Sequence, residues 1–243
     1  MKALVLAAGR GSRLSEKTQS INKCMIVVKE KPILYYNLTH IQNLSHSVSE
    51  IIIVVGYKKE TIIQYFGYEF SGIPITYIYQ DNLNGVVSAI DLAKNQIGNE
   101  NFMLMFGDEL IYKPQFEEMC HLFKNDRLDG ICGVIAASSS QEISKTYTVD
   151  IDCCGYIKNS IEKPLEPYNN LRGTGYCLFS NDLLKYISQT QVNHTRNQKE
   201  LCDWLNLCIE NDMHIKACEV GESTVNVNQK EDLLIAEKLI DEQ

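Results

Sequence analysis

Residues 1–25 read MKALVLAAGRGSRLSEKTQSINKCM, and the rest of the chain is interpreted from them. Lys2–Ala7 is a short apolar run, which predicts a buried strand. The run leads directly into a loop that contains Gly9 and Gly11. Glycines let a backbone come close to an anion, so that successive N–H groups point at phosphate oxygens. The stretch therefore predicts a strand followed by an anion-binding loop.

The loop differs from two common phosphate-binding loops. A dinucleotide fingerprint needs a third glycine and an acidic residue near the end of the second strand, but here that strand ends in Val55-Gly56. The chain also lacks the GK[ST] sequence of a Walker loop. Instead it has Arg13 and, ten residues later, Lys23. These cations suit a triphosphate better than a nicotinamide cofactor, which disfavours a dinucleotide-dependent oxidoreductase.

Beyond the loop, strand and helix patterns alternate up to residue 106. Predicted strands are 50–56, 75–79 and 101–106, and predicted helices are 33–44, 58–67 and 85–97. From about residue 130 the predicted strands are 130–136, 145–152, 155–163, 173–179 and 215–220, with helices at about 181–188, 199–210 and 229–240. This rhythm predicts a Rossmann-like three-layer α/β/α fold with a mixed, mostly parallel sheet. We expect one domain, 1–243, whose residues 1–130 mainly bind nucleotide and whose residues 131–243 mainly bind an acceptor.

Composition narrows the function classes. The net charge of −8 argues against nucleic-acid binding, which needs a basic face. No apolar run approaches the roughly 18 residues of a membrane span, and the opening run is too short for a signal peptide. Nine cysteines without a CxxC pair indicate reduced thiols. We therefore expect a cytoplasmic protein that binds neither nucleic acid nor membrane.

Polar or glycine-rich clusters follow the first four predicted strands. In a parallel sheet, ligands bind at the carboxyl ends of the strands. The clusters read AAGRGSR (7–13), GY (56–57), QDNLNG (80–85) and GDE (107–109). The sequence therefore predicts one binding site at this edge of the sheet.

These segments together resemble the sugar-1-phosphate nucleotidyltransferase family. LAAGRGSRL with the lysine that follows resembles the family signature, and later pieces match in order: KPILYYNL, YQDNLNG, FGDEL, IEKPLEP, GTGYCLF and VNVNQKEDLLIAEKLI. The resemblance covers nearly the whole chain and implies a GT-A-like nucleotidyltransferase fold. It also implies a reaction in which an acceptor phosphate attacks the α-phosphorus of a nucleoside triphosphate and pyrophosphate leaves. Positioning and charge neutralisation then dominate catalysis.

The resemblance assigns roles to single residues on the nucleotide side. Arg13 would hold the departing pyrophosphate, Lys23 would bridge the reacting phosphates, and Asp108 would hold Mg²⁺. Gln80 and Gly85 would contact the base, with CTP, UTP or dTTP as the expected nucleotide. The implied nucleotide-binding set is Leu6, Ala8, Gly9, Gly11, Ser12, Arg13, Lys23, Gln80, Gly85 and Asp108.

The chain departs from the family pattern near the expected metal. Many members have aspartate-x-glycine before the last helix, where this chain has Asn226-Val227-Asn228. Residues two apart on a strand face the same way, so either asparagine could offer a carbonyl oxygen to Mg²⁺. The alternative is a cap or turn asparagine. Glu16 and Asn22 stand where members usually have prolines, which predicts a signature loop that is more mobile before nucleotide binds.

The expected acceptor site departs as well. Tyr147-Thr148-Val149 replaces the family's Tyr-Gly-Val, and the threonine side chain is expected to narrow the pocket. The implied acceptor-binding residues are Tyr147, Thr148, Glu162, Lys163 and Gly175. The Glu162–Lys163 pair has a plain alternative, a surface ion pair. Glu200 and Asp203 either face the pocket or lie on a solvated helix face.

The expected activity is transfer of a nucleoside monophosphate to a small phosphorylated acceptor, with a sugar 1-phosphate first. The alternative is a CTP-dependent cytidylyltransferase that acts on a phosphocholine-like phosphate or phosphonate. A catalytically inactive regulatory protein is a remote alternative. We expect no appended acyltransferase. The sequence allows a homo-oligomer but does not predict the oligomeric state.

Overall fold

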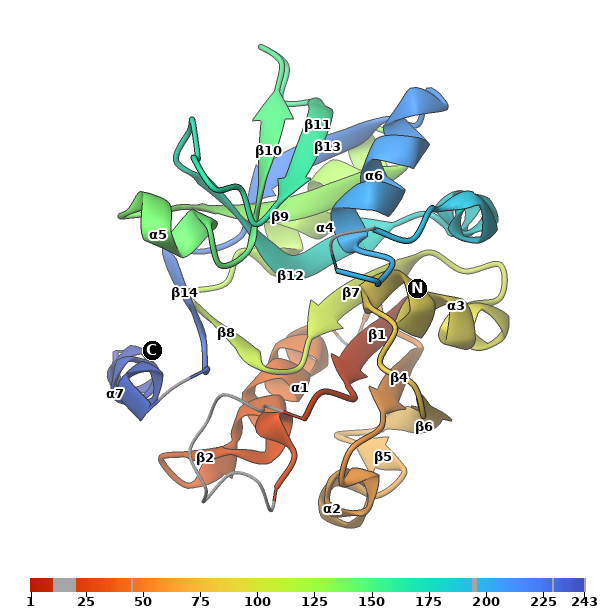
Figure 1. Cartoon of the computed structure of the whole chain (residues 1–243). Helices are drawn as coiled ribbons and strands as arrows, with labels where there is room; N and C mark the ends of the chain where they lie inside the picture. The colour runs from red at the N-terminus through yellow and green to blue at the C-terminus, as the bar shows by residue number, and fades with distance from the viewer. Residues whose placement is uncertain (11–20, 45, 194–195, 229, 243) are drawn as a thin grey trace.

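The computed structural model describes residues 1–10, 21–44, 46–193, 196–228 and 230–242. Figure 1 shows an eight-stranded sheet at its centre. Its strands are, in sheet order, β13 (Ile215–Glu219), β9 (Gly130–Ala136), β12 (Leu171–Phe179), β7 (Phe102–Phe106), β1 (Lys2–Ala7), β4 (Glu50–Val55), β6 (Ile73–Tyr79) and β5 (Glu69–Phe70). Strand β1 is parallel to β4 and β7, while β12 is antiparallel to β7 and β9. The predicted mixed, mostly parallel sheet is confirmed.

Helices cover both faces of this sheet because successive strand residues point to opposite faces. In β1, Ala3 and Val5 belong to one buried cluster and Leu4 to the other. The helices are α1 (Ile33–Asn43), α2 (Lys59–Phe66), α3 (Val86–Ile97), α4 (Phe116–Asn125), α5 (Ser140–Ile143), α6 (Leu201–Glu210) and α7 (Lys230–Asp241), with 3₁₀ helices η2 (Lys23–Met25) and η3 (Asn181–Gln189). The helix predicted near 181–188 is thus a 3₁₀ helix.

The C-terminal segment returns to the N-terminal half of the chain. Strand β14 (Ser223–Asn226) pairs antiparallel with β8 (Glu109–Tyr112), and α7 lies beside β14 in Figure 1. A small third core joins α7 to β8 and to the hairpin of β2 (Val27–Val28) and β3 (Lys31–Pro32). This pairing brings residues 226–228 next to residue 108, which the sequence could not show. A second hairpin, β10 (Tyr147–Ile151) and β11 (Ile157–Glu162), packs on α6.

All nine cysteines are free thiols, and six of them are buried. Trp204 is fully buried against Phe179 and belongs to the core. Within the described ranges, no helix combines the length and the apolar character that crossing a membrane requires.

Candidate active site

A pocket of about 270 Å³, here called the β1 pocket, opens at the carboxyl ends of the parallel strands. Segments that follow β1, β6 and β7 meet there, as the sequence predicted. The lining residues are Leu6, Ala8, Gly9, Lys23, Cys24, Gln80, Leu83, Gly85, Val86, Ala89, Phe106, Asp108, Gln198 and Glu200. The structure thus brings together every predicted nucleotide-side residue that it describes. Gly11, Ser12 and Arg13 lie outside the described residues.

Gly85 is required by the backbone at the rim of this pocket. Its φ is +96°, and a Cβ atom there would lie 2.5 Å from the carbonyl oxygen of Lys199. The close crossing carries Gln198 and Glu200 into the β1 pocket. Gln198 was not predicted, because nothing local in the sequence links residue 198 to residue 85.

Lys23 lies at the boundary of the β1 pocket and is 8% exposed. Its ammonium donates hydrogen bonds to the Asp108 carboxylate, to Asn226 Oδ1 at 2.7 Å and to Asn228 Oδ1 at 2.9 Å. An ammonium has three N–H donors, so these oxygens use all of them. Here this group of four residues is called the Lys23 cluster. The predicted candidates from three distant parts of the chain therefore meet at one cation.

Asn22 fixes the backbone next to Lys23. Its side-chain amide donates to the carbonyl oxygens of Ala7 and Tyr57, both at 2.8 Å, and its Oδ1 accepts from the Cys24 N–H at 2.8 Å. These three hydrogen bonds restrain Asn22 itself, whereas the mobility predicted for the loop also concerns Glu16, which lies outside the described residues. Asn22 ties the start of η2 to the ends of β1 and β4.

The Lys23 cluster also fits a divalent cation such as Mg²⁺. A carboxylate and two amide carbonyls are hard oxygen donors of the kind that Mg²⁺ takes. All three already converge on one positive charge, the Lys23 ammonium. Among the described residues no group of three or more His, Cys, Asp and Glu side chains could hold a metal. The Lys23 cluster is not such a group, because two of its three candidate ligands are asparagine amides and only Asp108 is a carboxylate.

Replacing Asn226 with aspartate should raise the affinity for a divalent ion by roughly ten-fold, because the number of charged ligands tunes such sites. A Mn²⁺ titration without nucleotide, followed by electron paramagnetic resonance, measures the change. Asn99→Asp, which adds the same charge in an exposed turn, is the matched control. Equal Mn²⁺ affinity in wild type and Asn226→Asp would remove Asn226 from the site.

Charged neighbours connect Glu162 to Glu200, which lines the β1 pocket. Arg196 Nη1 lies 3.7 Å from a carboxylate oxygen of Glu162 and 3.7 Å from one of Glu200. Lys163 adds a contact of 3.6 Å to Glu162. Burial raises the pKa of the Glu162 carboxyl, and Glu200 adds to the rise, while Lys163 and Arg196 oppose it. Arg196, which was not predicted from the sequence, therefore links Glu162 to Glu200 at the β1 pocket. Asp203 does not take part in this link; it forms a capping box with Glu200.

Tyr147 and Thr148 lie elsewhere than expected. The Tyr147 hydroxyl donates to the Thr174 carbonyl at 3.0 Å inside the core, and its ring packs over Gly173. The Thr148 hydroxyl is fully buried and bonds Asn169 Oδ1 at 2.7 Å. Both side chains are thus occupied within the protein, so the expected narrowing of a pocket by Thr148 is not seen. Only their backbone is left for an acceptor.

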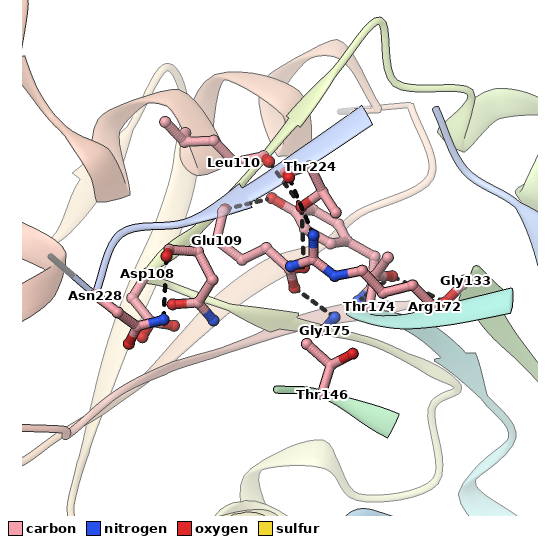
Figure 2. Close-up of polar contacts among 12 residues, drawn as sticks. Asp108, Glu109, Leu110, Gly133, Thr146, Arg172, Thr174, Gly175, Thr224 and Asn228 are labelled. Atoms are coloured by element: carbon pink, nitrogen blue, oxygen red, sulfur yellow. Dashed lines mark hydrogen bonds and ion pairs between the residues drawn. The ribbon is translucent and has the colours of Figure 1, made fainter. Parts of the chain in front are cut away.

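Gly175 lies directly beneath the active-site wall. A Cβ atom there would come 2.3 Å from the ring of Phe106, which lines the β1 pocket. The Gly175 N–H donates to the Glu109 carboxylate at 2.6 Å, a contact that Figure 2 shows together with Arg172. Burial raises the pKa of the Glu109 carboxyl. Gly175 therefore sets the position of Phe106, and its acceptor-binding role stays a prediction.

Comparisons with known proteins agree with this geometry. The sequence profile described as "Nucleotidyl transferase" matches residues 2–233. UTP–glucose-1-phosphate uridylyltransferase AglF of Haloferax volcanii is 32% identical over 243 residues, which cover 100% of this chain and 98% of AglF. The bifunctional protein GlmU of Methanocaldococcus jannaschii is 28% identical over 99% of this chain, which spans only 54% of GlmU. A crystal structure of UDP-glucose pyrophosphorylase complexed with UDP-glucose superposes with a TM-score of 0.87 at 22% identity, covering 99% of this chain and 98% of that chain.

Proposed function

Because this chain belongs to the nucleotidyl transferase family, we propose that it transfers a nucleoside monophosphate from a nucleoside triphosphate to a sugar 1-phosphate and releases pyrophosphate. The observation that carries the proposal is the convergence of Lys23, Asp108 and the β1 pocket at one edge of the sheet. AglF, which is named for UTP and glucose 1-phosphate, supports a uridine nucleotide first and dTTP or CTP after it.

The proposed reaction brings two anions together. A phosphate oxygen of the acceptor forms a bond to the α-phosphorus, and the bond from that phosphorus to the pyrophosphate oxygen breaks. Such a transfer depends on positioning and charge stabilisation, with no covalent enzyme intermediate. Lys23 is the one lysine or arginine among the described residues that line the β1 pocket, and Arg13 is proposed to hold the pyrophosphate as it leaves.

Mg²⁺ is proposed to bind Asp108 together with Asn226 and Asn228. It would neutralise phosphate charge during the transfer. Because these oxygens now accept hydrogen bonds from Lys23, giving them to the ion frees the ammonium to turn toward phosphate oxygens. The oxygens that hold Lys23 in this structure would be the ones to hold the metal ion.

The nucleotide base is proposed to lie in the β1 pocket. Gln80, which is 5% exposed, and Gly85 line this pocket together with Leu6, Ala8 and Gly9. Glu162 and Lys163 are proposed to bind the acceptor's hydroxyls and phosphate. We also propose that the chain acts as one domain in the cytoplasm, with its mainly nucleotide-binding half in residues 1–130 and its mainly acceptor-binding half in residues 131–243.

The other readings are less well supported. A cytidylyltransferase for phosphocholine-like acceptors rested on the altered Tyr-Thr-Val segment, and Thr148 is buried away from any pocket wall described above. An inactive regulatory protein rested on the two asparagines, yet their oxygens still converge on one cation.

A pyrophosphate-release screen tests the proposal directly. CTP, UTP, dTTP, ATP and GTP are each combined with glucose 1-phosphate, other sugar 1-phosphates and phosphocholine in the presence of Mg²⁺. We expect release with at least one sugar 1-phosphate and a pyrimidine nucleotide. Release with phosphocholine alone would contradict the sugar acceptor, and no release from any pair would contradict transfer itself.

A further inference from the structure

A second pocket, of about 720 Å³, lies over β14 and is here called the β14 pocket. The residues of its wall that matter here are Lys145, Thr146, Arg172, Ser223, Asn226 and Asn228. Of these six residues, the function proposed above uses only Asn226 and Asn228. The size of the β14 pocket is enough for a sugar-sized ligand, and its polar wall holds an unusual group, the Arg172 guanidinium.

Arg172 is buried but poorly bonded. Its side chain is 9% exposed, Nη1 donates to the Thr224 carbonyl at 3.2 Å, and Nη2 lies 3.9 Å from Glu109 Oε1. Its Nε has no hydrogen-bond partner among the residues that the structure describes. A guanidinium carries five N–H donors, so most of the donor capacity of Arg172 remains unused. Figure 2 shows Arg172 reaching in toward Glu109 and Thr224 from β12.

Ser223 adds a second unused donor on the same wall. In the described part of the chain, three buried side-chain polar atoms lack a partner: Arg172 Nε, Ser180 Oγ and Ser223 Oγ. Arg172 and Ser223 both line the β14 pocket, whereas Ser180 lies at the start of η3. Leaving a buried polar group unpaired is costly, so a ligand that pairs with both is favoured.

The acidic residues that line the pocket do not pair with Arg172, whose carboxylate contact in the described chain is the one to Glu109 at 3.9 Å. Glu142 accepts hydrogen bonds from the hydroxyl and N–H of Ser138, and Glu222 pairs with Lys113 at 2.8 Å. Asp232 accepts from the Asn228 N–H at 2.7 Å, where α7 begins. These carboxylates are committed to partners within the protein. The exposed Lys145 adds a further positive charge at the mouth.

The β14 pocket borders the Lys23 cluster. Asn226 and Asn228 line it and also accept hydrogen bonds from Lys23. On its other side, Thr146 lies next to Lys163, whose N–H donates to the Thr146 carbonyl at 2.6 Å. A ligand whose phosphate lies at Lys23 can therefore extend its body toward Arg172.

We propose that the acceptor carries a second anionic group, a carboxylate or a phosphate, and that Arg172 and Ser223 bind it in the β14 pocket. This inference rests on the proposed function and narrows its substrate class. A guanidinium binds either anion through paired N–H donors. The contact lies away from the reacting phosphate and exists both before and during the transfer, so it should act mainly on KM.

Three acceptors test the inference under the nucleotide that supports turnover: glucose 1-phosphate, glucuronic acid 1-phosphate and glucose 1,6-bisphosphate. We expect kcat/KM for one of the two doubly anionic acceptors to exceed that for glucose 1-phosphate by about 10- to 100-fold, mainly through KM. Which of the two is preferred separates a carboxylate from a phosphate. Arg172→Gln and Ser223→Ala should each reduce the preference.

Ser223→Ala keeps the test valid if Arg172→Gln fails to fold, because it removes only one hydroxyl. Ser180→Ala is the matched control, since it removes another buried unpaired hydroxyl outside this pocket and should leave the preference intact. Equal or better use of glucose 1-phosphate by the wild type would overturn the inference while leaving the proposed function standing. So would a preference that survives in every folded variant. No turnover with any acceptor would contradict both.

Discussion

Replacing Lys23 with alanine should lower kcat by about 10²–10³-fold, the usual loss when a preorganised transition-state donor is removed. Lys23 is held at the meeting point of the β1 pocket and the Lys23 cluster, and no other cation of the described chain lies in that cluster. Steady-state pyrophosphate release measures the effect. Lys23→Met, which keeps much of the side-chain volume, should behave the same way.

The same variant should bind a divalent ion more tightly in the absence of nucleotide. In the wild type, the Lys23 ammonium competes for the oxygens of Asp108, Asn226 and Asn228. Removing the competitor leaves these oxygens to Mn²⁺, so activity and metal affinity should change in opposite directions. Lys158→Ala is the control, because Lys158 is exposed and pairs only with Asp152 on the distant hairpin. Near-normal turnover in Lys23→Ala would refute the catalytic role.

Removing the metal, or its carboxylate, should have an effect at least as large. In the wild type we expect EDTA to abolish pyrophosphate release and Mg²⁺ to restore it. Asp108→Asn should lower kcat by about 10²–10⁴-fold, because metal charge neutralisation contributes several kcal/mol to phosphoryl transfer. Asp108 is the one carboxylate among the four residues of the Lys23 cluster.

The Asp108→Asn variant keeps the side-chain size, so folding should survive and can be checked by thermal unfolding. Asp91→Asn, on the exposed face of α3, removes the same charge and should leave kcat unchanged. Activity that persists in the presence of excess EDTA would show that the reaction needs no exchangeable metal. It would leave Asp108 with only its contact to Lys23.

The central sheet, and the edge of it where the candidate site lies, were predictable because they depend on local sequence patterns. Lys2–Ala7 was predicted as a strand, and β1 has the same bounds. Apolar runs that are buried on both faces identify parallel strands, and the polar residues that follow them must share an edge. Gln80 and Asp108 were placed correctly in one pocket for this reason alone.

The parts that were not predicted depend on contacts between distant segments. Short strands such as β8 and β14 exist only because they pair with each other, and this pairing decides that both asparagines face Lys23. The buried position of Thr148 follows from the β10–β11 register and the loop at Asn169. The sequence around Arg196 and Arg172 did not predict a role in a site, because an isolated arginine is usually a surface residue.

The most direct measurement is a crystal structure of the protein with a non-hydrolysable UTP analogue and Mg²⁺. We predict that the base lies against Gln80 and Gly85, that the triphosphate follows the backbone after Ala8, and that Lys23 Nζ has left Asn226 and Asn228 for the phosphates. A triphosphate bound away from the β1 pocket, with Lys23 still hydrogen-bonded to both asparagines, would contradict the account.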